Sequence, residues 1–174
     1  MNARTPDSSH LEPAEHAALL RAFGLNGPEP ELDAFAAQLA KEADVPYAMI
    51  NIFGSAQQFF GLHTPQSNSE WPTIGRSMPL EHGFCPEVVA RRKALVLPDV
   101  FSHPRFAGNP VIDQIGIRTY AGAPLIHDGS VLGTVCFVGP VERDLSTGRE
   151  SLALIKQRAD DVMTFLCRRS GLRP

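Results

Sequence analysis

The chain has few of the features that indicate a secreted, membrane-spanning or nucleic-acid-binding protein. Its 174 residues include three cysteines, one tryptophan and two tyrosines, and the net charge is −3. An odd number of cysteines without a framework spacing argues against a set of disulfides and fits reduced thiols. No apolar run approaches the roughly 20 residues that cross a bilayer, and the polar first ten residues lack the pattern of a secretion signal. We therefore expect a cytoplasmic protein that binds neither membrane nor nucleic acid.

Charge is unevenly distributed along the chain. Residues 1–46 carry three basic and eight acidic side chains, whereas residues 143–174 carry seven basic and four acidic ones. Opposite charge in these two segments predicts that they attract each other, either within one subunit or between two.

A buried β-hairpin is predicted between Arg118 and Val138. Two apolar runs, residues 120–126 and 131–138, flank the dipeptide Asp128-Gly129. This dipeptide favours a tight turn, because glycine adopts a positive φ at low cost. The second run leaves almost no polar position for a solvent face, so we expect the hairpin to be covered on both sides. With 43% hydrophobic residues, the chain is long enough to form one domain with a proper core.

Helices are predicted at both ends of the chain. The first follows a tail over residues 1–10 and runs from residue 13 to residue 23, and the second runs from about residue 30 to residue 43. The last begins at Thr147, where Thr-Gly-Arg-Glu matches a capping box. Its apolar residues recur at steps of three and four, which fits either a helix packed on the sheet or a dimer seam. These residues are Leu152, Ile155, Ala159, Val162 and Leu166.

Short elements and irregular segments alternate in the middle of the chain. In order, we predict a hairpin, a long loop, a short helix, a strand, an irregular excursion and one or two helical turns. They cover residues 47–53 with 57–62, 63–79, 86–92, 94–97, 98–110 and 111–115. The order predicts an α+β fold, with helices on one face of an antiparallel sheet and the irregular segment over the other, where it would roof a pocket.

Seven short phrases occur in order along the chain. They are V-P-Y-A-M-I-N-I-F (45–53), F-C-P-E-V-V (84–89), L-V-L-P-D-V (95–100), H-P-R-F-A-G-N-P-V-I (103–112), R-T-Y-A-G-A-P-L (118–125), D-G-S-V-L-G-T-V-C-F (128–137) and D-L-S (144–146). Each phrase alone is weak, but their succession is specific. Over residues 28–169 the sequence resembles a GAF domain of the bacterial sensor type. Residues 1–27 would then be a disordered tail and an N-terminal helix, and residues 170–174 a C-terminal tail. We expect a stand-alone GAF domain or a fragment of a longer protein.

The resemblance implies a GAF fold with about six antiparallel strands, the N- and C-terminal helices on one face, and a loop- and helix-roofed pocket on the other. GAF domains commonly bind small molecules and dimerise through terminal helices. The implied function is that of a non-catalytic sensory or signalling module, which binds an unidentified small molecule and acts through a partner protein or as a homodimer. The residues do not name a cofactor. A GAF domain with a closed pocket that serves only as a dimerisation scaffold is an alternative.

Eight residues are predicted to form the ligand site, as polar groups that orient a ligand and apolar walls that enclose it. They are Phe84, Cys85, Asp99, Phe106, Asn109, Ile112, Arg118 and Tyr120. A structural interpretation competes with this one, because aspartate and asparagine readily hold their own loops by bonding the local backbone. The six histidines show no metal-ligand spacing, so we predict no metal site.

Cys85 is the candidate for chemistry. With Pro86 as the first helical residue, Cys85 would cap the helix, where the helix dipole favours a thiolate. It is then either a redox-active thiol, a cofactor anchor, or a small buried residue beneath the roof. A thiol redox enzyme that acts through Cys85 is the other alternative function, since one GAF branch consists of the free methionine-R-sulfoxide reductases. That chemistry needs a second cysteine. That branch carries it in the segment matching residues 101–109, which here contain none, and we expect Cys136 and Cys167 to be core or surface residues.

Overall fold

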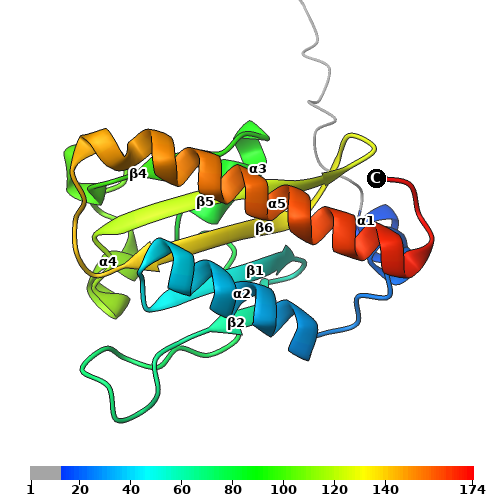
Figure 1. The fold of residues 1–174 in the computed structure, drawn as a ribbon, viewed down its shortest axis with the longest axis horizontal. Helices are drawn as coiled ribbons and strands as arrows, with labels where there is room; N and C mark the ends of the chain where they lie inside the picture. The colour runs from blue at the N-terminus through cyan, green and yellow to red at the C-terminus, as the bar shows by residue number, and fades with distance from the viewer. Residues whose placement is uncertain (1–12) are drawn as a thin grey trace, which may run out of the picture.

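Six antiparallel strands form one sheet at the centre of the molecule (Figure 1). The structure, a computed structural model, describes residues 13–174, and the tail expected over residues 1–10 lies outside them. The strands are β1 (Tyr47–Phe53), β2 (Gln57–His63), β3 (Ser77–Met78), β4 (Leu95–Leu97), β5 (Thr119–His127) and β6 (Ser130–Gly139). Across the sheet their order is β3-β2-β1-β6-β5-β4, which confirms the predicted six-stranded α+β fold. β3 was not predicted, since it lies in the segment assigned to a loop.

The hairpin of β5 and β6 turns where the sequence predicts, and its strand β6 is one of the two central strands of the sheet. Only Asp128 and Gly129 separate the two strands, and both have positive φ, of 46° and 78°. Two successive residues with positive φ match the twist of a two-residue hairpin turn, which explains the need for this dipeptide.

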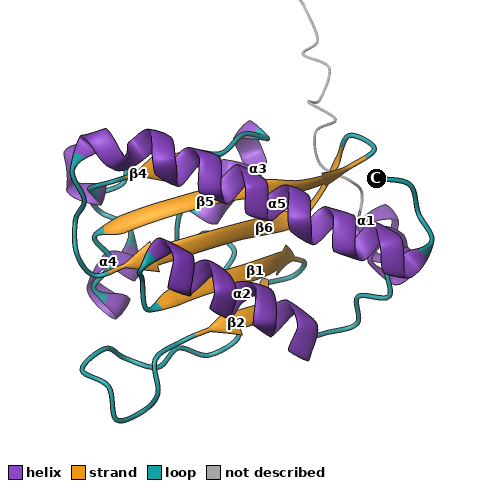
Figure 2. Ribbon diagram, in the orientation of Figure 1, coloured by secondary structure: helices purple, strands orange, loops and turns teal. Residues whose placement is uncertain are grey.

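Helices cover one face of the sheet (Figure 2). α2 (Pro30–Ala43) packs on β1 and β2, α5 (Gly148–Ser170) packs on β5, and α1 (Pro13–Ala22) contacts β6. The apolar stripe of α5 is buried against the sheet at Ile155, Ala159, Val162 and Leu166, whereas Leu152 is 38% exposed. Four of the five residues therefore pack within the chain rather than forming a dimer seam.

The opposite face carries the segment predicted to form the roof. α3 (Cys85–Arg91), η1 (Val100–Ser102), α4 (Pro110–Ile115) and the loops that flank them lie over this face, and we call them together the lid. α3 begins at Cys85, and its N-cap residue is Phe84, so the prediction that Cys85 caps the helix is wrong by one residue. A turn of 3-10 helix, η2 (Leu145–Thr147), precedes α5.

The capping box predicted for α5 is also wrong. Thr147 occupies the N-cap position but gives no side-chain cap, and its hydroxyl instead donates to the Asp144 carbonyl at 2.7 Å. The Asp144 carboxylate accepts a bond from the Ser146 N–H, so the preceding turn, and not the first turn of α5, is held by a side chain.

The sheet separates two hydrophobic cores. On the helix side, Val135 and Phe137 of β6 pack with residues of α2 and α5. On the lid side, Cys136 and Val138 of the same strand pack with residues of α3 and α4. Successive side chains of a strand point to opposite faces, so the unbroken apolar run of β6 supplies both cores. The prediction that the hairpin is covered on both sides is confirmed.

The oppositely charged terminal segments are joined within the chain. Arg158 donates to the Glu42 carboxylate at 2.7 and 2.8 Å, and Arg169 pairs with Glu29. Arg169 also donates to the carbonyl of Phe23 at 3.1 Å, which fastens the end of α5 to the segment after α1.

Candidate functional site

A cluster of buried polar side chains lies between the lid and the sheet. Its members come from four elements, α3, β1, β5 and β6, and all are less than one tenth exposed. We call them the polar centre: Asn51, Cys85, Tyr120, Thr134 and Cys136. Buried polar groups require partners, so their grouping in an otherwise apolar core is the most unusual feature of this face.

The sulfur of Cys85 lies at the middle of the polar centre. It is 3.2 Å from the Tyr120 hydroxyl, and Cys85 lines the same small cavity as Cys136. The Tyr120 ring packs on Phe84, with 5.2 Å between ring centroids, and its hydroxyl lies over Gly122. A Cβ atom at Gly122 would be 2.0 Å from that hydroxyl oxygen, so glycine is what lets the tyrosine reach the sulfur.

The two thiols of the polar centre have opposite electrostatic environments. Hydrogen bonding from Cys136, supported by Thr134, Tyr120 and Asn51, lowers the pKa of Cys85 to about 7, although burial alone would raise it. The hydrogen bond to Cys85, together with burial, raises the pKa of Cys136 well above that of an ordinary thiol. Burial, and then negative charge on the two cysteines, raises the pKa of Tyr120 well above its usual range. The polar centre therefore favours one thiolate, on Cys85.

Hydrogen bonds connect the polar centre to the lid through Gln57. The Asn51 amide donates to the Gln57 side-chain oxygen at 2.7 Å. The Gln57 amide in turn donates to three backbone carbonyls of the loop before α3, those of Pro79, Leu80 and His82, at 2.8, 3.1 and 2.6 Å. One buried glutamine thus holds the loop that leads into α3.

Two oxygens of the polar centre make no hydrogen bond. The side-chain oxygen of Asn51 and the hydroxyl of Thr134 are buried without a partner, and the two residues are cross-strand neighbours in β1 and β6. Thr134 is close enough to stabilise charge on Cys85, but its hydroxyl lacks the geometry of a hydrogen bond. A buried polar atom without a protein partner can accept a hydrogen bond from an ordered water or from a small guest.

The space beside the polar centre is small. A cavity of about 20 Å³ is bounded by four members of the polar centre, by Gln57 and by apolar residues of the lid and the sheet. The four members are Asn51, Cys85, Tyr120 and Cys136. A volume of roughly 10–15 Å³ accommodates one water molecule, so this cavity is closed to anything larger than a water-sized guest.

The structure gathers half of the predicted site residues beneath the lid. Phe84, Cys85, Ile112 and Tyr120 are all buried in the lid-side core. Phe106 packs edge-on against Phe84, with 5.7 Å between centroids, and is partly buried at the outer side of the lid. These apolar side chains fill the space that a pocket would need.

The polar members of the predicted site hold loops. Asn109 caps α4 by accepting from the Val111 N–H, and its side chain makes two bonds to Gly83, donating to the carbonyl at 2.8 Å and accepting from the N–H at 3.0 Å. Asp99 accepts from the Phe101 N–H at 3.0 Å and caps η1. None of the three polar predicted residues lines the cavity.

The third polar residue, Arg118, lies at the surface. Its guanidinium is 3.8 Å from Asp99 and 3.5 Å from Glu142, and it stacks on the Phe101 ring at 4.7 Å. This arrangement braces the end of β5 against η1, at a distance from the polar centre.

Sequence reasoning missed Asn51, Gln57, Thr134 and Cys136. A signal was available for the last two: Thr134, Cys136 and Val138 alternate along β6 and so share one face. The alternation is hidden because the residues between them are apolar as well. For Asn51 and Gln57 the only signal is polarity inside otherwise apolar strands.

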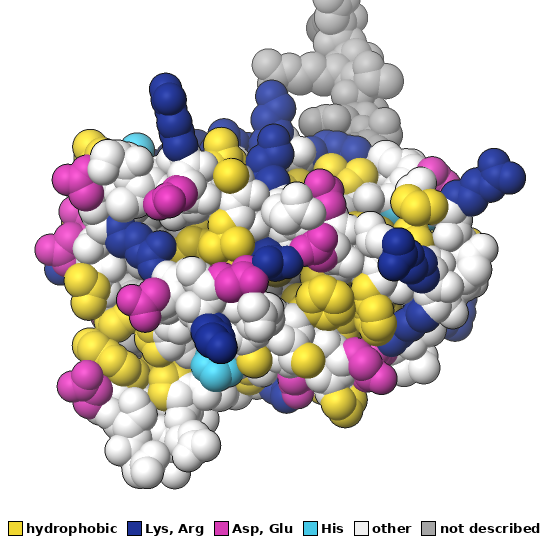
Figure 3. All heavy atoms as spheres, viewed as in Figure 1, with side chains coloured by type: hydrophobic (Ala, Val, Ile, Leu, Met, Phe, Trp, Pro, Cys, Tyr) yellow, Lys and Arg dark blue, Asp and Glu magenta, His cyan; other side chains and the backbone are white. Residues whose placement is uncertain are grey.

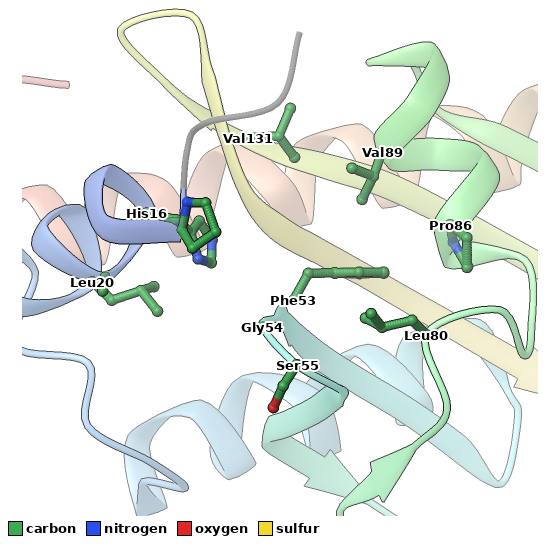
Figure 4. Close-up of a pocket in the computed structure, with 11 residues that line it drawn as sticks. His16, Leu20, Phe53, Gly54, Ser55, Leu80, Pro86, Val89 and Val131 are labelled. Atoms are coloured by element: carbon green, nitrogen blue, oxygen red, sulfur yellow. The ribbon is translucent and has the colours of Figure 1, made fainter.

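A second hollow lies at the end of the sheet, outside the lid (Figure 4). It is an open groove of about 690 Å³ between α1, the turn after β1 and α3. Leu20, Leu80, Pro86, Val89 and Val131 are among the apolar residues around it. Although much larger than the cavity, the groove contains no cysteine; its polar side chains are those of Ser55 and His16, and the ring nitrogen of His16 lies 3.1 Å from a backbone carbonyl of β6. We therefore place the candidate site at the polar centre.

The described residues hold no group of three or more histidine, cysteine, aspartate or glutamate side chains that could bind a metal ion. In residues 13–174, no helix combines the length and the apolar character needed to cross a membrane.

Comparison with known proteins identifies the fold and the family. Solved structures of similar fold include the GAF domain of an Acinetobacter phosphoenolpyruvate-protein phosphotransferase, at 14% identity and a TM-score of 0.61, over 89% of this chain and 92% of that one. A type II free methionine-R-sulfoxide reductase from Thermoplasma acidophilum aligns at 13% identity and a TM-score of 0.59, over 79% and 91%. The A. aeolicus nlh2 GAF domain in an inactive state aligns at 16% identity and a TM-score of 0.58, over 88% and 94%.

These identities show the fold alone, and no curated protein matches the sequence. The family model of the GAF domain matches residues 27–165, which is most of the chain. The order of the strands, the helices at both ends of the chain and the lid agree with that match. The chain therefore belongs to the GAF domain family.

Proposed function

We propose that this GAF domain is a non-catalytic sensory module, which binds a small polar molecule at the polar centre and acts in the cytoplasm through a signalling partner or a second copy of itself. The observation that supports this most directly is the unpaired side-chain oxygen of Asn51, which lines the cavity; its cross-strand neighbour Thr134, whose hydroxyl is also unpaired, is not among the lining residues. Each unpaired buried polar atom costs about 1–3 kcal/mol. A guest with N–H or O–H donors would offset this cost, and an apolar guest would not.

Binding of such a guest must move the lid. The closed cavity of about 20 Å³ takes a water-sized molecule, so any larger ligand displaces side chains of α3 or α4. The lid is tied down at two places, by Gln57 beneath the loop before α3 and by Asn109 between that loop and α4. A ligand that competes for these hydrogen bonds would shift the lid to a new position. A sensor requires such a ligand-dependent change of conformation.

The helical face is the proposed contact surface for a second copy or a partner. Figure 3 shows hydrophobic side chains among charged ones in the region of α2 and α5. Phe35 of α2 and Phe165 of α5 pack at a tilt, with 5.3 Å between ring centroids, and both remain partly exposed. Sedimentation velocity of the full chain at micromolar concentrations tests this surface: we expect a dimer that Phe165→Glu dissociates, and a wild-type monomer would contradict the homodimer.

Two alternatives remain distinct from this proposal. The closed cavity favours a domain that binds no ligand and serves only as a scaffold. The paired thiols of Cys85 and Cys136 invite comparison with a methionine sulfoxide reductase, but both are buried beside a cavity far smaller than an amino acid. A sulfoxide substrate would have to displace the lid before it reached Cys85.

Thermal unfolding with a panel of amino acids and oxoacids tests ligand binding. A true ligand at a hundred times its Kd adds about 2.7 kcal/mol of stability, which corresponds to roughly 5–11 °C in Tm for a domain of this size. We expect Asn51→Leu to abolish this shift and Asn26→Leu, at an exposed asparagine, to keep it. If no compound of the panel raises Tm of the wild-type chain, the scaffold replaces the sensor as the preferred function.

A further inference from the structure

Two thiols from distant parts of the sequence meet in the polar centre. Cys85 belongs to α3 and Cys136 to β6; α3 packs on β6, and both cysteines line the same small cavity, although neither is in a disulfide. The side chains are 5% and 0% exposed. The third cysteine, Cys167, is also buried, but its sulfur faces a ring nitrogen of His127 at 3.8 Å and has no thiol beside it. The pair is therefore a specific feature of the lid side.

The two cysteines differ in their surroundings, which favour a nucleophilic thiolate on Cys85 and a protonated thiol on Cys136. Cys85 receives stabilising contacts from Tyr120 and Cys136, which favour its thiolate. Cys136 lies at the middle of the sheet between β1 and β5, where burial favours the neutral thiol. A thiolate beside a protonated thiol in the same small cavity is the arrangement from which a disulfide forms once one sulfur is oxidised.

The size of the cavity selects the oxidant. It adjoins both sulfurs and has about 20 Å³, which suits a guest close to water in size. Hydrogen peroxide has only two heavy atoms, so it fits with little displacement of the lid. Larger oxidants, including sulfoxides of amino acids, do not fit while the lid is closed.

We propose that Cys85 and Cys136 form a peroxide-reactive dithiol, which hydrogen peroxide oxidises to an intramolecular disulfide between the lid and the sheet. The Cys85 thiolate attacks one oxygen of the peroxide, the O–O bond breaks, and the departing hydroxide takes up a proton to leave as water. Cys85 is then a sulfenic acid. The Cys136 sulfur attacks the Cys85 sulfur, the S–S bond forms, the S–O bond breaks, and the hydroxyl group leaves as a second water with the Cys136 proton. Two thiols lose two electrons in total, and one peroxide gains them.

The disulfide would change the lid. An S–S bond of about 2.05 Å is much shorter than the approach of two non-bonded sulfurs, so its formation draws the first turn of α3 toward β6. The same turn carries Pro86, which lines the open groove shown in Figure 4. Oxidation at the buried pair would thus alter a surface site, without any ligand.

Peptide mapping of the full chain tests the proposal. The reduced protein is exposed to a small excess of hydrogen peroxide, its remaining thiols are blocked with N-ethylmaleimide under denaturing conditions, and the intact mass and the tryptic peptides are measured. We expect two of the three thiols to be lost, with a linked peptide that joins Cys85 to Cys136. Three free thiols after this treatment, or a bridge that involves Cys167, would overturn the proposal.

Matched variants separate the roles of the thiols. Cys167→Ser should form the same disulfide as the wild-type chain, whereas Cys136→Ser should stop at a sulfenic acid on Cys85 that dimedone traps. Mapping of the wild-type chain needs no variant, so a variant that fails to fold leaves the test intact. The disulfide proposal does not depend on ligand binding. If no compound raises Tm, the disulfide proposal still stands, and if peroxide forms no disulfide, the ligand-binding proposal still stands.

The pH dependence of thiol loss gives a second readout. Among the described residues that line the cavity, the titratable groups are Cys85, Tyr120 and Cys136. No Asp, Glu, Lys, Arg or His side chain of the described residues lines it. With the pKa of Cys85 at about 7, the thiolate fraction and the oxidation rate rise about tenfold from pH 6 to pH 8. An ordinary thiol of pKa about 8.5 would give a rise of about 80-fold. A ratio near 80 would show that the polar centre does not activate Cys85.

Discussion

Gln57 should be the most sensitive polar residue beneath the lid. Its side chain accepts from the Asn51 amide and donates to three carbonyls of the loop before α3, and it is 1% exposed. Gln57→Leu keeps most of the volume but removes all four bonds. The Asn51 amide is then buried without a partner, at about 1–3 kcal/mol. The loop carbonyls can turn to water, so their loss adds only about 1 kcal/mol.

The sum is a loss of roughly 2–4 kcal/mol in the free energy of unfolding, which corresponds to about 1–2 M in the urea midpoint for a domain of this size. Gln58→Leu is the matched control, since Gln58 neighbours Gln57 on β2 and is exposed. It should change stability by less than about 0.5 kcal/mol. The double variant Asn51→Leu with Gln57→Leu should recover part of the loss, because the stranded amide is removed with its partner.

Hydrogen exchange identifies where the stability is lost. In Gln57→Leu the amides of residues 79–84 should exchange faster than in the wild-type chain, while those of α5 keep their protection. Equal urea midpoints for Gln57→Leu and Gln58→Leu, or a double variant less stable than Gln57→Leu alone, would refute the role given to this side chain.

Two further predictions concern packing and pH. Gly122→Ala places a Cβ atom 2.0 Å from the Tyr120 hydroxyl, so we expect the free energy of unfolding, measured in urea, to fall by about 1–3 kcal/mol. Gly75→Ala is the control and should be neutral, because no atom lies within 4 Å of its added Cβ. Equal effects of the two changes would contradict this packing. Burial alone would raise the pKa of Asp33, but hydrogen bonds from Arg76 and from a backbone N–H lower it overall. A carboxyl group with a lowered pKa contributes stability to the fold. This contribution is complete above the unfolded pKa of about 3.9 and is lost as the pH falls through the folded pKa. Asp33→Asn should therefore flatten the decline of the urea midpoint below about pH 4, and an unchanged decline would show that this pair does not contribute.

Local sequence signals are enough to predict the elements of the fold. The positive φ of Asp128 and Gly129, the two hairpins, and the terminal helices each depend on residues close together in the chain. Opposite charge also predicted correctly that the terminal segments pair, because Glu42 with Arg158 and Glu29 with Arg169 span the domain. β3 was missed because two residues with a single edge partner leave no periodic signal.

The polar centre could not be predicted in the same way. Cys85 and Cys136 are 51 positions apart, and their contact depends on how the lid folds back over β6. The period of two that would place Cys136 on the lid side is obscured, because Val135 and Phe137 are as apolar as the residues on the other face. Asn109 was predicted as a site residue, with a loop-holding role as the alternative. Its bond to the Val111 N–H is of the local kind that asparagine favours, but its two bonds to Gly83 join segments 26 positions apart, which no local signal predicts.

The division of the interior by the sheet gives the domain two separable units of cooperativity. Residues such as Leu32, Ile155 and Leu166 form a core that never touches the lid, while Phe84, Val88 and Val111 belong wholly to the other. Sub-global opening of the second core leaves the first, and the strands it supports, in place. The lid can therefore exchange conformations many times within the lifetime of one folded molecule, and a change on that side need not threaten the survival of the fold.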